Sequence, residues 1–257
     1  MATAFEGERF DIGRTVSRGF APIGRHPALF LGLALLFGIL PNAVVRGFAW
    51  SGIASASALG GIAAGLLTVV ASLVGFVCVF ILQASVIHAA VVDLNGGAPS
   101  LGASVRPSLS LILPLIGLAI VSGLGYALGF ALLLVPGIIL LVVWSVAVPA
   151  LVEERGGIMG SLARSRELTK GARWRIFATL IVVGVIVYLP SMVLTFAGGG
   201  IAAAALRAQS FSVAGVLLIV FNGLASMILA AMVAAIYLEL RTVKEGASKE
   251  SLASIFA

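Results

Sequence analysis

The side chains that could carry chemistry are few, and they lie at the edges of long apolar runs. The chain of 257 residues contains ten acidic residues, two histidines and one cysteine. All ten carboxylates lie at or beyond the ends of the apolar runs, so no acid is available in the middle of a run to relay protons. Catalysis needs titratable or nucleophilic groups that converge on one point. The pattern argues against a proton-coupled pump and predicts that the protein is not an enzyme.

One acidic pair is the best candidate for a functional site. Glu153 and Glu154 end an apolar run and precede an Arg-rich segment, and Pro149 removes a backbone hydrogen bond one turn earlier. Glu153 is therefore a candidate binding residue, with a structural anchor that fixes the helix end by salt bridges as the alternative. His88 and Asp93 end another run but lie about 140° apart on a helix, so they do not share a face. We interpret His88 as a packed histidine, with a functional role as the alternative.

Three amide side chains lie within apolar runs, at Asn42, Gln83 and Asn222. Asn222 and Ser226 are one helical turn apart, and a buried amide prefers a partner on a neighbouring helix. We predict an interhelical hydrogen bond for Asn222, with a polar point in a ligand or lipid cavity as the alternative. No His/Cys cluster has metal-ligand spacing and no Gly-rich phosphate loop occurs, so we predict no metal and no cofactor.

Composition places the chain in a membrane. Hydrophobic residues make up 61% of the sequence and charged residues 10%, whereas soluble domains have roughly 45–50% and 25%. Six apolar runs have about the length that crosses a ~30 Å hydrocarbon core. We predict an all-α integral membrane protein with a six-helix domain over residues 27–240. The predicted crossings are residues 27–45, 62–92, 109–134, 137–152, 174–197 and 212–238, with an interruption at Pro41-Asn42, an outer loop after residue 197 and a tail at 241–257.

Two further segments are typical of amphipathic interfacial helices. Within residues 1–26 an apolar arc faces an arginine arc: Ile12, Val16, Phe20 and Ile23 against Arg14, Arg18 and Arg25. A second such helix is predicted at residues 158–172. Basic amphipathic helices bind anionic membrane surfaces, so we expect anionic phospholipids as partners. Nucleic acid is not expected, because the basic residues are not gathered with aromatic residues on a soluble module.

The distribution of Lys and Arg predicts the topology. With both termini in the cytoplasm, fourteen basic residues lie inside and two, Arg46 and Arg207, lie outside. We predict a multi-pass protein of the bacterial inner membrane. A cleaved signal peptide is the alternative interpretation of the first run, since Ala54-Ser55-Ala56 resembles a cleavage site. It is disfavoured because 26 residues precede that run.

A threefold internal repeat is one interpretation of three similar segments. In each, a Gly follows an apolar residue and an Arg follows shortly after: Ile12-Gly13 with Arg18, Leu101-Gly102 with Arg106, and Met159-Gly160 with Arg164. The fold would then be three copies of a surface helix followed by a helical hairpin. Chance similarity among Gly-rich amphipathic segments is the other interpretation.

The stretch from Val135 to Phe177 carries a family resemblance. Its ordered residues are Pro136, Gly137, Trp144, Pro149, Glu153, Ser165, Leu168, Lys170 and Gly171. The order resembles the bacterial family named for the membrane domain of glycerophosphoryl diester phosphodiesterases, with its stand-alone relatives. The resemblance implies an N-terminal surface helix and six crossings in the inner membrane. It does not imply phosphodiesterase activity, because the catalytic part of the fused enzyme is a soluble barrel for which this chain has no room.

Two functions fit these observations best. The first is a non-enzymatic membrane protein that organises or maintains the envelope through lipid and protein contacts, as a homo-oligomer or with a membrane-protein partner. The second is a transporter of a small molecule or lipid, which would need a continuous polar path between the helices. A headgroup enzyme would have to draw on Glu153, Glu154, His88 and Asp93, all at the inner ends of the crossings.

Overall fold

The computed structural model describes residues 10–54, 58–207 and 213–255, and every regular element within these ranges is a helix. The elements are α1 (Ile12–Arg25), α2 (Pro27–Leu33), the π-helical turn η1 (Ala34–Ile39), α3 (Leu40–Ala54), α4 (Ala58–Leu94), α5 (Leu101–Ser110), α6 (Ile112–Leu132), α7 (Leu134–Val143), α8 (Ala147–Glu154), α9 (Gly157–Thr169), α10 (Arg173–Arg207) and α11 (Val213–Ile255). Six segments are long and apolar enough to cross a membrane: Pro27–Gly47, Gly65–Leu94, Ile112–Leu132, Leu134–Glu154, Arg173–Pro190 and Gly215–Glu245. The predicted all-α membrane fold is confirmed.

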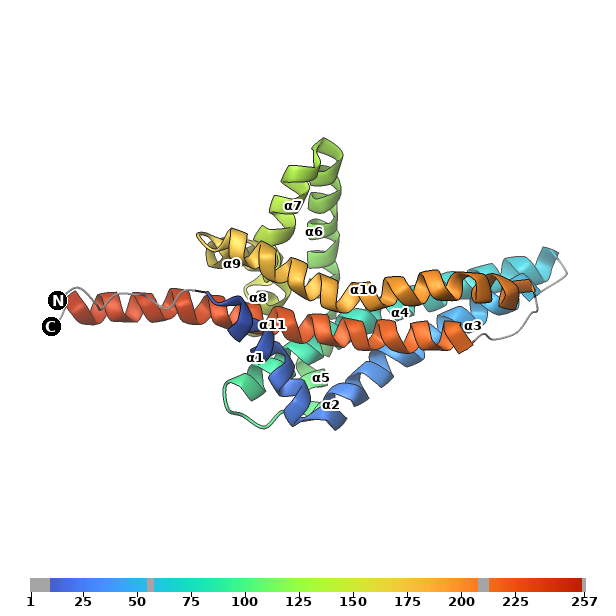
Figure 1. The fold of residues 1–257 in the computed structure, drawn as a ribbon, viewed down its shortest axis with the longest axis horizontal. Helices are drawn as coiled ribbons and strands as arrows, with labels where there is room; N and C mark the ends of the chain where they lie inside the picture. Colours follow the sequence, from blue (N-terminus) through green and yellow to red (C-terminus); the bar gives the residue numbers. More distant parts are fainter. Residues whose placement is uncertain (1–9, 55–57, 208–212, 256–257) are drawn as a thin grey trace.

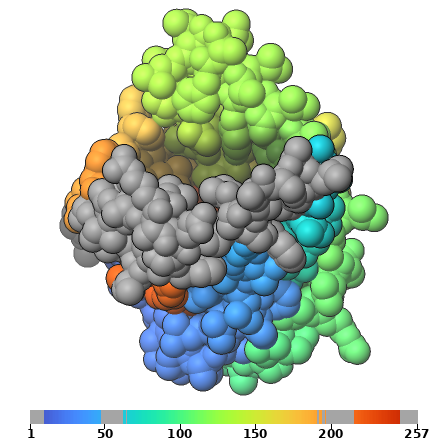
Figure 2. Space-filling model, turned by 90° about the vertical axis from the view of Figure 1, so that its right-hand side faces the viewer, coloured from blue at the N-terminus to red at the C-terminus, as the bar shows by residue number. Residues whose placement is uncertain are grey.

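Four long helices form the main bundle. α3, α4, α10 and α11 lie along the long axis of the molecule, with α3 against α4 and α11 against both α4 and α10 (Figure 1). The hairpin of α6 and α7 rises away from this axis and is a separate mass when the molecule is viewed along it (Figure 2). Both helices of the hairpin therefore carry exposed apolar side chains, among them Leu113, Leu124, Leu128, Leu132 and Val135.

Close helix contact in the bundle depends on glycine. A Cβ on Gly38 would lie 3.2 Å from the Cα of Gly223, and a Cβ on Gly223 would lie 2.5 Å from the side chain of Ile39. Small residues of this kind let two membrane helices approach closely. The contact lies in the π-helical turn η1, which immediately precedes Leu40 and Pro41. The predicted interruption at Pro41-Asn42 thus takes the form of a wide turn just before the proline, which cannot donate a backbone hydrogen bond.

Along the chain, a unit made of a short helix and a hairpin of long helices occurs three times. Each short helix packs on the helix that ends the preceding unit: α5 on α4, α9 on α8, and α1 on α11. The buried stripes of the short helices are similar: Thr15, Gly19 and Pro22 in α1, Ser104 and Ser108 in α5, and Ser161, Ser165 and Leu168 in α9. Because α1 packs on the last long helix, the arrangement is cyclic. It supports the interpretation of an internal repeat.

Helix ends differ from the sequence-based boundaries at several places. α10 continues to Arg207, where a loop was expected from residue 198, since the alanine run at 202–205 favours helix. α11 continues to Ile255 through the predicted tail, supported by an Arg241–Glu245 pair at 2.9 Å, four residues apart. The fourth predicted crossing, 137–152, is divided between α7 and α8. The difference has a local cause at Trp144 and Pro149.

Candidate functional site at the charged end of the bundle

Carboxylates near the ends of α4 and α8 and within α11 are bound by side chains of other helices. We use "charged end" for this part of the molecule, which holds Asp93, Glu153, Glu154 and Glu239 together with α1 and α9. It lies opposite the tips of the α3–α4 and α10–α11 hairpins (Figure 1). Buried charges are stable only when they are paired and hydrogen-bonded. The partners of each acid therefore decide what the site can do.

Glu239 of α11 is buried, with only 1% of its side chain exposed. One carboxylate oxygen accepts from the Arg14 guanidinium, whose Nε lies 2.9 Å away, and the other accepts from Arg18 at 2.7 Å. Both arginines come from α1, one turn apart. Two cations thus neutralise a single buried carboxylate, and they fix α1 to α11.

The start of α1 and its packing stripe explain how the arginines reach Glu239. The Asp11 carboxylate caps the helix by accepting from the Arg14 backbone N–H at 2.7 Å. The buried stripe of Thr15 and Gly19 lies between the arginine arc and the apolar arc. A Cβ on Gly19 would lie 2.3 Å from the sulfur of Met232, so this contact needs glycine. The arginines of the predicted surface helix thus bind carboxylates of the same chain, and their contact with anionic lipid stays a prediction.

Asp93 is held at the other end of α1. Its carboxylate accepts from Arg25 at 2.8 Å and lies 3.1 Å from Nε2 of His26, and its own side chain is 3% exposed. α1 therefore bridges the end of α4 and the middle of α11. The sequence placed Asp93 at the inner end of a crossing but did not predict that its carboxylate is buried.

His88 and Glu153 come together across two helices. Nδ1 of His88 in α4 lies 3.0 Å from Oε1 of Glu153 in α8, and both side chains are mostly buried. The sequence placed both residues at the inner ends of their crossings but did not pair them. Their equal expected depth in the membrane was the signal that could have linked them.

Glu154 has more partners than Glu153. Arg164 of α9 donates from Nε to both carboxylate oxygens at 2.9 Å, and the hydroxyl of Tyr237 donates to one of them at 2.8 Å. Arg164 also donates to Glu245 at 2.6 Å. Burial alone would lower the pKa of Arg164, but the hydrogen bond and charge of Glu154 outweigh it and raise that pKa. The buried Tyr237 carried no sequence signal that set it apart from the apolar residues around it.

The first part of the family-like motif builds the tip of the α6–α7 hairpin. A single extended residue, Leu133, joins the two helices, and Pro136 lies in the first turn of α7. Gly137 faces α6, where a Cβ would lie 2.5 Å from the ring of Phe130. From the other side, a Cβ on Gly129 would lie 3.0 Å from the Cα of Gly137. Pro136 and Gly137 therefore have a structural role in this turn.

The second part of the motif divides α7 from α8. The helix breaks at Trp144, whose ring packs on Gly125 and lies 5.6 Å from the ring of Tyr126. Pro149 lies in the first turn of α8. The carbonyl of Val143, at the break, accepts a hydrogen bond from the Ser165 hydroxyl of α9 at 2.7 Å. The backbone carbonyl left free by the break thus receives its hydrogen bond from a side chain of the following short helix.

Gly171 completes the motif in the turn between α9 and α10. Its φ of 90° lies in the left-handed region, which only glycine adopts without strain. The motif residues therefore shape the hairpin, the break and the turn, and Glu153 is the one member that holds a titratable partner.

The amides within the apolar helices bond to their own backbones. The Asn42 side chain donates to the carbonyl of Gly38 and that of Asn222 to the carbonyl of Leu218, both at 2.7 Å. Gln83 is half-buried and has no hydrogen bond to the residues that the structure describes. The predicted interhelical bond of Asn222 is wrong. The side chain is exposed on the surface of α11, where its nearest acceptor is the carbonyl one turn earlier.

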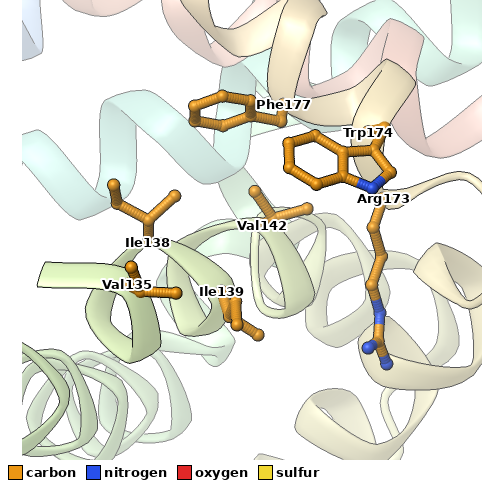
Figure 3. Close-up of a pocket in the computed structure, with 7 residues that line it drawn as sticks. All are labelled: Val135, Ile138, Ile139, Val142, Arg173, Trp174 and Phe177. Atoms are coloured by element: carbon orange, nitrogen blue, oxygen red, sulfur yellow. The ribbon is translucent and has the colours of Figure 1, made fainter. Parts of the chain in front are cut away.

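Two hollows lie near this end. One, of about 320 Å³, is lined by residues of α8 and α9, including Glu154, Arg164 and Glu167. The other is an apolar groove of about 450 Å³ between α7 and the start of α10 (Figure 3). Within the described ranges no three His, Cys, Asp or Glu side chains gather closely enough to hold a metal ion.

No family model, curated protein or solved structure matches this chain. The resemblance of the 135–177 stretch to the phosphodiesterase membrane-domain family stays a prediction based on the order of its residues.

Proposed function

We propose that this protein is a non-enzymatic, multi-pass protein of the bacterial inner membrane that organises the surrounding membrane through lateral contacts with lipid and protein. The observation that carries this proposal is the α6–α7 hairpin, which stands apart from the bundle with apolar side chains exposed on both helices (Figures 1 and 2). Large exposed apolar surfaces mark sites of membrane or protein contact.

The hydrogen bonds of the buried carboxylates support a structural role for them. Glu239, Asp93 and Glu154 each receive hydrogen bonds from at least one arginine of a short helix. A general acid or base must present a proton or lone pair toward a substrate. Carboxylates that are already bound by guanidinium groups are better suited to hold helices together than to act on a headgroup.

The transport alternative has less support. It needs polar groups that face a shared path between helices, yet Asn42 and Asn222 use their amide N–H groups on carbonyls of their own helices. The His88–Glu153 pair has no arginine partner among the described residues, so it is the best place for a group that takes part in transport or catalysis. The variant Glu153→Gln therefore distinguishes the two functions.

Reconstituted vesicles test the proposal. The purified protein, placed in phosphatidylethanolamine and phosphatidylglycerol vesicles, is expected to release no headgroup and to pass no solute. A photoreactive residue at Leu124 or Leu128 should form adducts with lipid or with a second copy of the chain. The same residue at the buried Leu118 should form few. Headgroup release or solute flux that disappears in Glu153→Gln would overturn the proposal.

A further inference from the structure

The apolar groove beside the hairpin is closed at its base and open above it. At the base, Val142 of α7 and Ile176 of α10 belong to one buried cluster. Away from the base the two helices diverge (Figure 1). The apolar lining comes from one face of α7 and from the first turns of α10: Val135, Ile138, Ile139, Val142, Trp174 and Phe177. Its volume of about 450 Å³ lies within the range of small-molecule pockets, about 300–1,000 Å³.

The base of the groove is marked by Trp174. This side chain is 83% exposed, although it begins an apolar helix, and its ring meets that of Phe177 edge to face at 6.1 Å. Exposed tryptophans of membrane helices lie at the level of the lipid headgroups. The groove thus begins at headgroup depth and continues along α7 toward the hydrocarbon.

A positive charge lies at the same place. Arg173 lines the groove beside Trp174, and its guanidinium points away from the rings of Trp174 and Phe177 (Figure 3). Among the residues that the structure describes, Arg173 has no carboxylate partner, and neither do Arg166 and Lys170, which are also exposed. Arg164, by contrast, is bound by three glutamates. The corner between α9 and α10 therefore holds cations that have no counter-ion among the described residues.

From this juxtaposition we propose that the groove binds one acyl chain of an anionic phospholipid, with the lipid phosphate at Arg173. The planar guanidinium fits two phosphate oxygens at once, and the apolar wall of α7 replaces the neighbouring chains of the bilayer. This proposal rests on the function proposed above and assigns one lipid-binding site to the hairpin.

Native mass spectrometry of the full chain, released from nanodiscs of phosphatidylglycerol and phosphatidylcholine, tests the site. We expect one retained phosphatidylglycerol per chain. Arg173→Gln should weaken its retention roughly tenfold, as expected for the loss of charge-assisted hydrogen bonds. Ile139→Trp, which fills the exposed side of the groove, should displace the lipid. Arg106→Gln and Leu128→Trp are matched controls outside the groove and should leave retention unchanged.

A second readout keeps the test independent of protein yield. Phosphatidylglycerol with a photoreactive group on its acyl chain should label the α7 segment of the wild-type protein, and Ile139→Trp should lower that labelling. Equal retention and labelling in all variants would mean bulk lipid only and would overturn the proposal. Labelling of α7 by a second copy of the chain in place of lipid would also overturn it. Either result leaves the proposed function standing, whereas solute flux or headgroup release would refute that function even if the lipid were bound.

Discussion

The attachment of α1 to Glu239 gives a prediction with a calculable size. The perturbation is the double variant Arg14→Gln/Arg18→Gln, which leaves the Glu239 carboxylate without its two guanidinium donors. Removing one partner of a buried ion pair costs about 3–5 kcal/mol, because the remaining charge stays buried. The side chains of Arg14 and Arg18 are 34% and 41% exposed, so solvent screens the pairs and the lower value, about 3 kcal/mol, is expected.

Removing the carboxylate instead of the arginines should cost less free energy of folding. Glu239→Gln leaves two arginines that can turn to water, so we expect a loss of about 1 kcal/mol, the size of an ordinary hydrogen-bond change. The triple variant, in which Glu239, Arg14 and Arg18 are all glutamine, should recover most of the loss of the double variant, because no buried charge remains without a partner.

Hydrogen exchange of the backbone amides in α1 measures these differences in the intact protein. A loss of about 3 kcal/mol should accelerate their exchange roughly a hundredfold, since each 1.4 kcal/mol is a factor of ten. Arg106→Gln in α5 is the control, because Arg106 has no ion pair with the described part of the chain. Exchange of the double variant at the wild-type rate would contradict this role of the two arginines. An acceleration by Glu239→Gln as large as that of the double variant would contradict it as well.

Three further predictions concern topology, the hairpin and the break between α7 and α8. A reporter fused at Gly156 should be cytoplasmic and one at Ala205 periplasmic, as the distribution of Lys and Arg requires; reversed activities would contradict the proposed orientation. Gly137→Val should cost about 1–3 kcal/mol by overpacking against α6 and lower the yield of monodisperse protein in size-exclusion chromatography. Gly123→Val is its control, since nothing lies within 4 Å of a Cβ there, and equal yields would refute the account of the turn. Ser165→Ala should lower the free energy of unfolding by about 1 kcal/mol, measured by thermal denaturation in detergent, because it removes the donor at the break; Ser165→Thr, which keeps a hydroxyl, should lose less.

The sequence was sufficient to predict the class of fold and the approximate positions of the helices, because a crossing needs a long apolar run and each run is visible by itself. It was not sufficient to predict contacts between runs. The pairing of His88 with Glu153, and of Glu239 with the α1 arginines, depends on which helices are neighbours. The relation of α1 to α11 joins residues 225 positions apart. No local pattern encodes such a contact.

The hydrogen-bond partners of single polar residues could not be predicted from the neighbouring sequence either. Ser165 was singled out by the order of its motif, but its partner is the carbonyl of Val143, which becomes free only because the helix breaks. For Asn222 the predicted partner was too distant. An amide in an apolar run was expected to seek another helix, yet its position on the outside of α11 left only its own backbone within reach.

Because the packing of the short helices is cyclic, α1 is synthesised well before the helix on which it packs. α1 is made before α11, and its binding partner Glu239 lies 225 positions after Arg14. At roughly 5–20 residues per second, Arg14 is synthesised about 11–45 s before Glu239. During this interval the arginines of α1 have no acid of α11 to bind. The pairing of α1 with Glu239 is therefore a late step of folding, and it closes the ring of helices.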